Sequence, residues 1–317
     1  MDVLKAKEQV VQAGIEISQS GLIARTWGNV SVRTGADEFA ITASGRNYMT
    51  LTPDEVIQIK IEDLSYEGDV KPSSEKKLHK EIYRLKPEVG FVIHTHQSNA
   101  SAVAAMGLKK IRFNKEYPGI GYTVTVADYG LPGTKKLCKN TAAAVEASKG
   151  QAVIMSNHGA VCYGKDYEEA FSIAQTLEEA CGEYLRSIGV EPWSPEDNFY
   201  DGDLWNNSPV IMKFMEVRDV LKPYLDDFAQ LVGMKLNVVD YDEALIAKAI
   251  DDGTPLLVRG KGALCAAPVE SDKEAISLVI EKNCRAALAA IGSKPINPVE
   301  SFIMRQFYLK KYSKRSE

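Results

Sequence analysis

Residues 71–96 read KPSSEKKLHKEIYRLKPEVGFVIHTH, and this stretch decides the fold of the first part of the chain. Ser73, Ser74 and Glu75 are residue types that commonly open a helix, and residues 74–87 predict that helix. A glycine is reached three residues later, and the apolar run of residues 90–96 predicts a buried strand that ends on two histidines. The helix therefore leads directly into a central strand.

The segments on either side alternate between strands and helices. TWGNVSVR (26–33) and EFAITASG (38–45) predict two strands joined by a short turn, and Pro53 predicts the first position of a further helix. The other expected elements are a helix over 3–17, a strand over 57–63, a helix near 99–106, strands near 111–113 and 122–126, a helix over 135–148, a strand and turn over 151–159, and a helix over 166–189. Hairpins mixed with strand–helix alternation predict an α/β fold with a mixed, partly antiparallel sheet covered by helices.

Residues 191–208, EPWSPEDNFYDGDLWNNS, break this pattern with Pro, Asp, Asn and aromatic residues. We expect a boundary here, which gives a first domain over 1–205 and a second over 206–317. The second domain partly repeats the first, because with an offset of 103 positions AVIMSNHGAVC (152–162) meets PLLVRGKGALC (255–265) and a helix follows each. At this offset His158 meets Lys261, so the second copy lacks a histidine at that place.

Composition limits the class of protein. The chain has 317 residues, 45% of them apolar, and a formal net charge of −5, which suits a globular protein and argues against a general nucleic-acid surface. No signal-peptide pattern and no run of about 18 apolar residues is present, so we expect a cytoplasmic protein that does not span a membrane. Five widely spread cysteines without a Cys-x-x-Cys pair argue against both a disulfide framework and a thiolate zinc site. No P-loop or Gly-x-Gly-x-x-Gly turn supports a nucleotide-binding domain.

Three of the four histidines stand at the ends of expected strands. His94 and His96 are two positions apart on one strand, so their side chains share a face and can meet one ion. His158 ends another apolar run and is followed by Gly159. Each histidine alone would more often hydrogen-bond within the core. The pair together with a distant strand-end histidine predicts a catalytic metal site with an open coordination position, as is typical of zinc.

Glu75 and the serines before it allow two interpretations. A polar and acidic helix N-terminus is common for capping reasons alone. The same position also receives a phosphate group well, and a carboxylate there can touch both metal and substrate. His79 lies one helical turn after Glu75, and we expect a structural role for it because the other three histidines already form a ligand set.

Taken together, these segments closely resemble the class II aldolase/adducin family, whose best-known member type is L-fuculose-phosphate aldolase. The resemblance rests on TWGNVSVR, ITASG, residues 71–96, DYGLPGT (128–134) and SNHGAVCYG (156–164), which stand in family order within residues 1–190. Beyond about residue 205 the resemblance fades to the partial repeat.

The resemblance implies a three-layer α/β/α fold with a mixed, largely antiparallel sheet, followed by a C-terminal α/β extension. It implies a zinc site of His94, His96 and His158, with Glu75 as ligand or catalytic base and with Mn²⁺ or Co²⁺ as alternative metals. The implied phosphate pocket consists of Asn29, Ser44, Gly45, Ser73 and Ser74. In the family, zinc chelates the hydroxyl and carbonyl oxygens of a ketose phosphate and stabilises the enediolate formed as the carbon–carbon bond breaks, so the expected products are dihydroxyacetone phosphate and an aldehyde.

Related activities stay open at this point. Relatives with this site act as sugar-phosphate 4-epimerases, methylthioribulose-phosphate dehydratases or decarboxylases. Glu75 in place of Asp favours an aldolase over an epimerase, and the two serines before it argue mildly against a dehydratase. An adducin-like interaction module would have lost the ligands, which this chain keeps. Family active sites are commonly shared between subunits, so we expect a homo-oligomer; Tyr117 is only a loose match to the family's proton-donating tyrosine.

Overall fold

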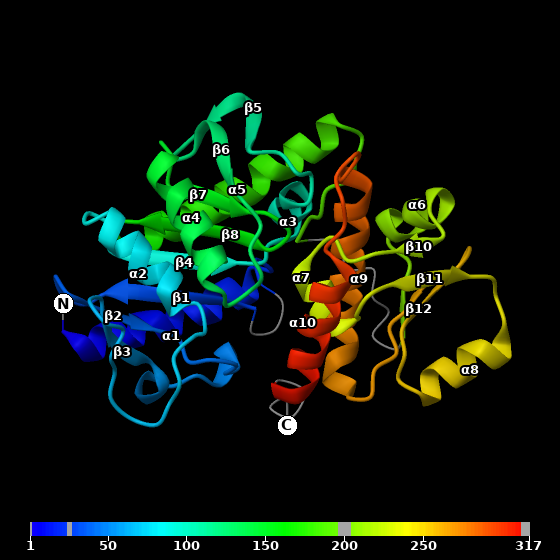
Figure 1. The fold of residues 1–317 in the computed structure, drawn as a ribbon, viewed down its shortest axis with the longest axis horizontal. Coiled ribbons are helices and arrows are strands. Elements are labelled where there is room, and N and C mark those ends of the chain that lie inside the picture. The colour runs from blue at the N-terminus through cyan, green and yellow to red at the C-terminus, as the bar shows by residue number, and fades with distance from the viewer. Residues whose placement is uncertain (1, 24–26, 196–203, 312–317) are drawn as a thin grey trace. The chain divides into compact units, whose positions relative to one another are not determined.

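The computed structural model describes residues 2–23, 27–195 and 204–311, which fall into two compact units (Figure 1). Unit 1 comprises residues 1–100 and 108–181, and unit 2 comprises residues 101–107 and 182–317. The expected boundary segment 191–208 lies partly in residues 196–203, outside the described residues. The division into domains 1–205 and 206–317 therefore stays a prediction.

Unit 1 is built on an eight-stranded sheet with the order β3-β2-β1-β4-β8-β7-β6-β5. Its strands are β1 (Gly28–Arg33), β2 (Glu38–Ile41), β3 (Ile57–Lys60), β4 (Phe91–Thr95), β5 (Lys110–Tyr117), β6 (Gly121–Ala127), β7 (Ala152–Met155) and β8 (Gly159–Gly164). Strands β6 and β7 pair in parallel, and every other neighbouring pair is antiparallel. This confirms the predicted mixed, largely antiparallel sheet.

The helices in the first part of the chain lie where the apolar spacing predicts them. They are α1 (Val3–Gln19), α2 (Lys76–Leu85), α3 (Ser98–Ala104), α4 (Lys135–Ala147) and α5 (Tyr167–Ser187). The expected helix at Pro53 is only a single 3-10 turn, Pro53–Glu55, closed by a capping box between Thr52 and Glu55. It ends there because Val56 is extended and β3 begins at the next residue to pair with β2.

Alternation along β4 assigns the helices to the two faces of the sheet. Phe91 faces one side, where its ring packs edge-on against Tyr167 of α5 at 5.4 Å, and the Tyr167 hydroxyl donates to Glu16 of α1. His94, three residues further along the strand, faces the other side. That side is covered by α2 and α4, which pack against each other (Figure 1). Unit 1 therefore has the three α/β/α layers that the family resemblance implies.

Unit 2 contains a second, smaller sheet of five strands with the order β10-β11-β12-β13-β9. The strands are β9 (Trp205–Asn206), β10 (Val220–Leu221), β11 (Leu236–Val239), β12 (Leu256–Val258) and β13 (Gly262–Leu264). The helices are α6 (Pro209–Val217), α7 (Asp226–Leu231), α8 (Glu243–Asp251), α9 (Glu270–Ala289) and α10 (Pro298–Lys311). The C-terminal segment is thus an α/β extension. Among the described helices of both units, none has the length and apolar character needed to cross a bilayer.

Candidate active site

Strand register brings the first two polar side chains together. Strand β4 lies between β1 and β8, and Asn29 of β1 stands directly opposite His94 of β4. Directly opposed residues of an antiparallel pair point to the same face, so both side chains lie on the α2 side of the sheet. His96 follows at the end of β4, on the same face as His94 by its spacing of two.

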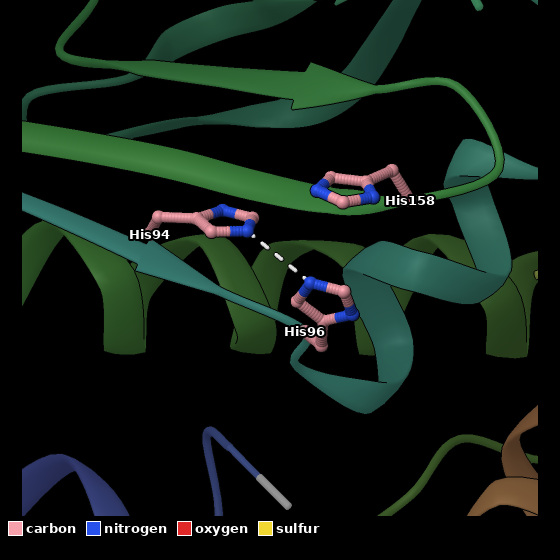
Figure 2. Close-up of side chains that lie close together, drawn as sticks. All are labelled: His94, His96 and His158. Carbon is pink, nitrogen blue, oxygen red and sulfur yellow. Dashed lines mark hydrogen bonds between the residues drawn. The ribbon is translucent and has the colours of Figure 1, made fainter. Parts of the chain in front are cut away.

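The turn between β7 and β8 delivers the third histidine. Residues 156–158 connect the two strands, and Asn157 adopts the left-handed conformation with φ 59°, which asparagine tolerates better than most residues. The backbone of His158 donates to the carbonyl of Met155 at 3.1 Å, and Ser156 donates to Ala127 at 3.1 Å, so the turn is held at both ends. The His158 ring then stacks on the His94 ring with 5.0 Å between centroids (Figure 2).

The three imidazoles fit a divalent metal ion. Their candidate ligand nitrogens lie within 4.8 Å of one another, and all three side chains are buried. The His94 Nδ1–H donates to the carbonyl of Ala160 at 2.8 Å, which leaves the lone pair on Nε2, directed at the His96 Nε2 3.2 Å away (Figure 2). Two nitrogens bound tetrahedrally to zinc at about 2.0–2.1 Å lie roughly 3.3 Å apart. The carbonyl that fixes the His94 tautomer is the usual outer partner of a ligating histidine.

Glu75 faces two of these rings, those of His94 and His158, from the N-terminus of α2. Its Oε2 lies 3.0 Å from His94 Nε2, and its Oε1 lies 3.2 Å from His158 Nε2. Burial raises the pKa of Glu75, but the two neighbouring imidazoles outweigh burial and hold the pKa well below the usual range of a glutamate. The carboxylate is therefore ionised at neutral pH. It can act as a further ligand or as a proton acceptor next to the metal.

A chain of buried hydrogen bonds supports Glu75 from behind. Asn29 donates from Nδ2 to Glu75 Oε2 at 3.0 Å, and its Oδ1 accepts from His79 Nε2 at 2.5 Å. The Ser31 hydroxyl donates to His79 Nδ1 at 2.6 Å and accepts from the Tyr83 hydroxyl at 2.8 Å. With the hydrogen bonds running from Tyr83 towards Glu75, every N–H and O–H donor has an acceptor when His79 is neutral. His79 is thus not a member of the three-histidine set. The sequence analysis did not predict its place in this series of hydrogen bonds.

The residues expected to bind phosphate come from two neighbouring turns. Ser44 N donates to the carbonyl of Lys71 at 2.9 Å, and Ser73 N donates to the carbonyl of Thr42 at 3.0 Å, so the turn at 42–45 lies against the segment at 71–75. Ser44 and Gly45 are half-buried, Ser74 is exposed, and Ser73 is buried with its Oγ accepting from Glu75 N. The Asn29 amide, by contrast, is engaged at both ends by Glu75 and His79. A shared phosphate pocket of these residues stays a prediction.

The neutral state of His79 predicts an acid sensitivity. Burial is the main cause that lowers the pKa of His79 from 6.5 to about 3, with the His94 imidazole adding to it. Since the unfolded chain binds this proton more readily, stability from neutral His79 is fully present above pH 6.5 and is lost as pH falls towards 3. We expect the urea midpoint of His79→Gln to fall less between pH 6.5 and about 4.5 than that of the wild type. Parallel pH curves for the two proteins would contradict this role of His79.

The packing around Gly159 predicts a second sensitivity, at the candidate metal ligands. A Cβ at this position would meet the carbonyl oxygen of Thr95 at 2.2 Å and the Cα of His96 at 3.3 Å. Gly159→Ala should therefore displace His96, lower the stability by about 1–3 kcal/mol and weaken metal binding. Gly35→Ala is the matched control, since a Cβ there meets no atom within 4 Å and the substitution should be neutral. Equal metal affinity of the two variants, measured by competition with a chelator, would argue against this packing constraint.

Comparisons with known proteins agree on one family. The family described as Class II Aldolase and Adducin N-terminal domain matches residues 8–185. A 5-deoxy-D-ribulose 1-phosphate aldolase of Bacillus thuringiensis serovar kurstaki is 31% identical over 197 residues, which cover 61% of this chain and 91% of that protein. A 5-methylthioribulose-1-phosphate/5-deoxyribulose-1-phosphate aldolase of Rhodospirillum rubrum is 31% identical over 183 residues, covering 57% of this chain and 80% of that protein.

A solved structure gives the same result. The structure of an L-fuculose 1-phosphate aldolase matches with a TM-score of 0.54 and 27% sequence identity, over 61% of this chain and 91% of that chain. The match covers a share of this chain similar to that of the sequence relatives. Because the family match spans more than half of the 317 residues, the chain belongs to the class II aldolase and adducin N-terminal domain family.

Proposed function

We propose that this protein is a zinc-dependent aldolase that cleaves a ketose 1-phosphate into dihydroxyacetone phosphate and an aldehyde. The family and the named relatives support an enzyme of the lyase class that acts on a sugar phosphate. The observation that carries the proposal is the convergence of three buried imidazoles and one ionised carboxylate on a single point. His94, His96 and His158 would hold a divalent metal there, and that metal would supply Lewis-acid polarisation of substrate oxygens.

The side chains around this point divide the remaining work. Glu75 is placed to accept or return a proton, because both of its oxygens lie at the imidazole cluster and its low pKa keeps it ionised. Asn29 holds one of these oxygens in place. Ser44, Gly45, Ser73 and Ser74 lie on the two adjoining turns, where the serine hydroxyls can donate to the substrate phosphate.

Two other kinds of function serve as alternatives. The same metal chemistry supports epimerisation, dehydration or decarboxylation of a sugar phosphate. An adducin-like interaction module has no need for four converging metal-binding side chains. A homo-oligomer and a cytoplasmic location stay predictions.

A panel of ketose 1-phosphates tests the aldolase assignment. We expect the zinc-loaded protein to release dihydroxyacetone phosphate from 5-deoxyribulose 1-phosphate or fuculose 1-phosphate, detected by a coupled triose-phosphate assay. A chelator should abolish the release and added zinc should restore it, because the three imidazoles supply the metal-binding groups. Substrate consumption without triose phosphate would point to an epimerase or a dehydratase. A protein that holds no stoichiometric metal and turns over no substrate would point to an interaction module.

A further inference from the structure

The two sheets share one arrangement of strands. In unit 1, β5-β6-β7-β8-β4 is a continuous part of the sheet, and in unit 2 the whole sheet has the order β10-β11-β12-β13-β9. The strand senses agree at every step: antiparallel, parallel, antiparallel and antiparallel. Helices also fall at matching points, since α4 and α8 precede the third strand of each series and α5 and α9 follow the fourth.

The turn that carries His158 has a counterpart of equal construction. Residues 156–158 join β7 to β8, and residues 259–261 join β12 to β13. The middle residue is left-handed in both turns, with φ 59° at Asn157 and φ 73° at Gly260. The last residue closes each turn on the strand before it, by His158 N to the Met155 carbonyl at 3.1 Å and by Lys261 N to the Val258 carbonyl at 2.9 Å. Lys261 is therefore the structural equivalent of His158.

The glycine after each turn identifies the equivalents of the other two histidines. A Cβ on Gly159 would meet the Thr95 carbonyl oxygen and the His96 Cα. A Cβ on Gly262 would meet the Asn206 carbonyl oxygen at 2.5 Å and the Asn207 Cα at 3.1 Å. Asn207 thus occupies the place of His96.

Strand pairing gives the last equivalent. His94 stands opposite Val161 of β8, and Trp205 stands opposite Leu264 of β13. The offset of 103 positions equates Val161 with Leu264, so Trp205 occupies the place of His94. Trp205 packs against a buried cluster that includes Ala249 of α8, on the face that corresponds to the α4 side of unit 1.

In unit 2, a positively charged side chain, that of Lys261, lies beside the equivalent of His94. The Lys261 Nζ lies 4.6 Å from the centre of the Trp205 ring and 5.2 Å from the centre of the Tyr241 ring, within the range of cation–π attraction. In the described part of unit 2, β9 ends the sheet, at the edge where β1 pairs with β4 in unit 1. The counterpart of β1, which carries Asn29, is therefore missing there.

We propose that unit 2 is a truncated second copy of the core of unit 1, in which the Lys261 ammonium has replaced the metal ion. The three ligand positions are still present as Trp205, Asn207 and Lys261, but their side chains hold no divalent metal. Of these two equivalent positions in the described residues, the one in unit 1 is then the catalytic centre. The equivalence of positions in the two units follows from backbone geometry. The inference rests on the proposed function only where it treats His94, His96 and His158 as a metal site.

Restoring the histidines tests the equivalence. The full chain first receives His94→Ala, His96→Ala and His158→Ala, which remove the site of unit 1. Trp205→His, Asn207→His and Lys261→His are then added, and Co²⁺ is the probe, followed by its visible absorption and by metal analysis after gel filtration. We expect about one Co²⁺ per chain, against none in the parent with three alanines, because three imidazoles at these positions form a catalytic-type site. A folded restored variant without Co²⁺ would overturn the proposal.

Two further measurements cover a restored variant that does not fold. A second variant adds only Asn207→His and Lys261→His to the parent with three alanines, and so keeps Trp205 and its packing. Its two new imidazoles should bind Cu²⁺ at least tenfold more tightly than the parent does. Equal Cu²⁺ affinity of the two proteins overturns the proposal. The variant with the three alanine substitutions in unit 1 and no change in unit 2 should also hold no zinc. One zinc ion per chain in this variant overturns the proposal. Absence of zinc from the unsubstituted chain contradicts the proposed function alone, and metal gained by the restored variant still supports this inference.

Discussion

We expect His94→Ala to lose both the bound metal and the aldolase activity. Among the proposed ligands, His94 faces two of the other groups through one atom, because its Nε2 lies 3.2 Å from His96 Nε2 and 3.0 Å from Glu75 Oε2. Loss of a partner outside the ligand shell already costs about 10–100-fold in metal affinity, so loss of this ligand should exceed about 100-fold. Zinc content after gel filtration and the rate of dihydroxyacetone phosphate release measure the two effects.

The fourth histidine supplies the matched control. His79 is fully buried and two hydrogen bonds away from Glu75 Oε2, but it lies outside the set of candidate ligands. His79→Gln should therefore keep its zinc, although a displaced Asn29 can lower the turnover. Unchanged turnover in His94→Ala would remove the proposed mechanism, and equal zinc loss in both variants would indicate that the substitutions act on the fold as a whole.

Local spacing is sufficient to predict the strand position of each of the three histidines. His94 and His96 share a face by the period of a strand, and an apolar run before His158 marks it as a strand end. Their meeting point depends on β8 pairing with both β4 and β7. A single sequence does not give the pairing register of strands 66 residues apart, such as those of His94 and Ala160. The sequence therefore predicts that the three imidazoles converge, but the distances between them follow only from the folded sheet.

The support behind Glu75 shows what sequence reasoning missed and why. Asn29 and Ser31 are two apart on β1, and Glu75, His79 and Tyr83 are each four apart along α2. These are the spacings of one strand face and one helix face, and the two faces meet through hydrogen bonds. The polar pattern was thus visible in the sequence. The contact between the two faces was not, because it depends on how the helix packs against the sheet.

The second unit was harder to predict because its elements are short. Strands β9 and β10 have two residues each, which is too little for a period-two pattern. The offset of 103 positions still identified the turn before Gly262 and the replacement of His158 by Lys261. The equivalents of His94 and His96 lie at a different offset, because the segment between β4 and β8 differs in length from the segment between β9 and β13. A gap-free comparison cannot find them.

We expect Glu75→Gln to lower the turnover by about 10²–10⁴-fold while the zinc content stays unchanged. The substitution keeps the size of the side chain but removes the carboxylate that accepts a proton. Burial raises the pKa of this carboxylate, but the imidazoles of His94 and His158 outweigh burial and hold the pKa well below the usual range. Three imidazoles remain, and such a set binds catalytic zinc without a carboxylate. Single-turnover release of dihydroxyacetone phosphate and zinc analysis of the same sample give both quantities.

Glu81→Gln is the matched control on the same helix. Glu81 forms an ion pair with the exposed Arg84 at 2.9 Å, and ion pairs near the surface contribute at most about 1 kcal/mol. Its turnover should equal that of the wild type. If Glu75→Gln loses zinc together with activity, Glu75 acts chiefly as a ligand and the proton must move through another group. Full turnover in Glu75→Gln would contradict both roles, because neither a ligand nor a base at this position can be replaced by a neutral amide without loss.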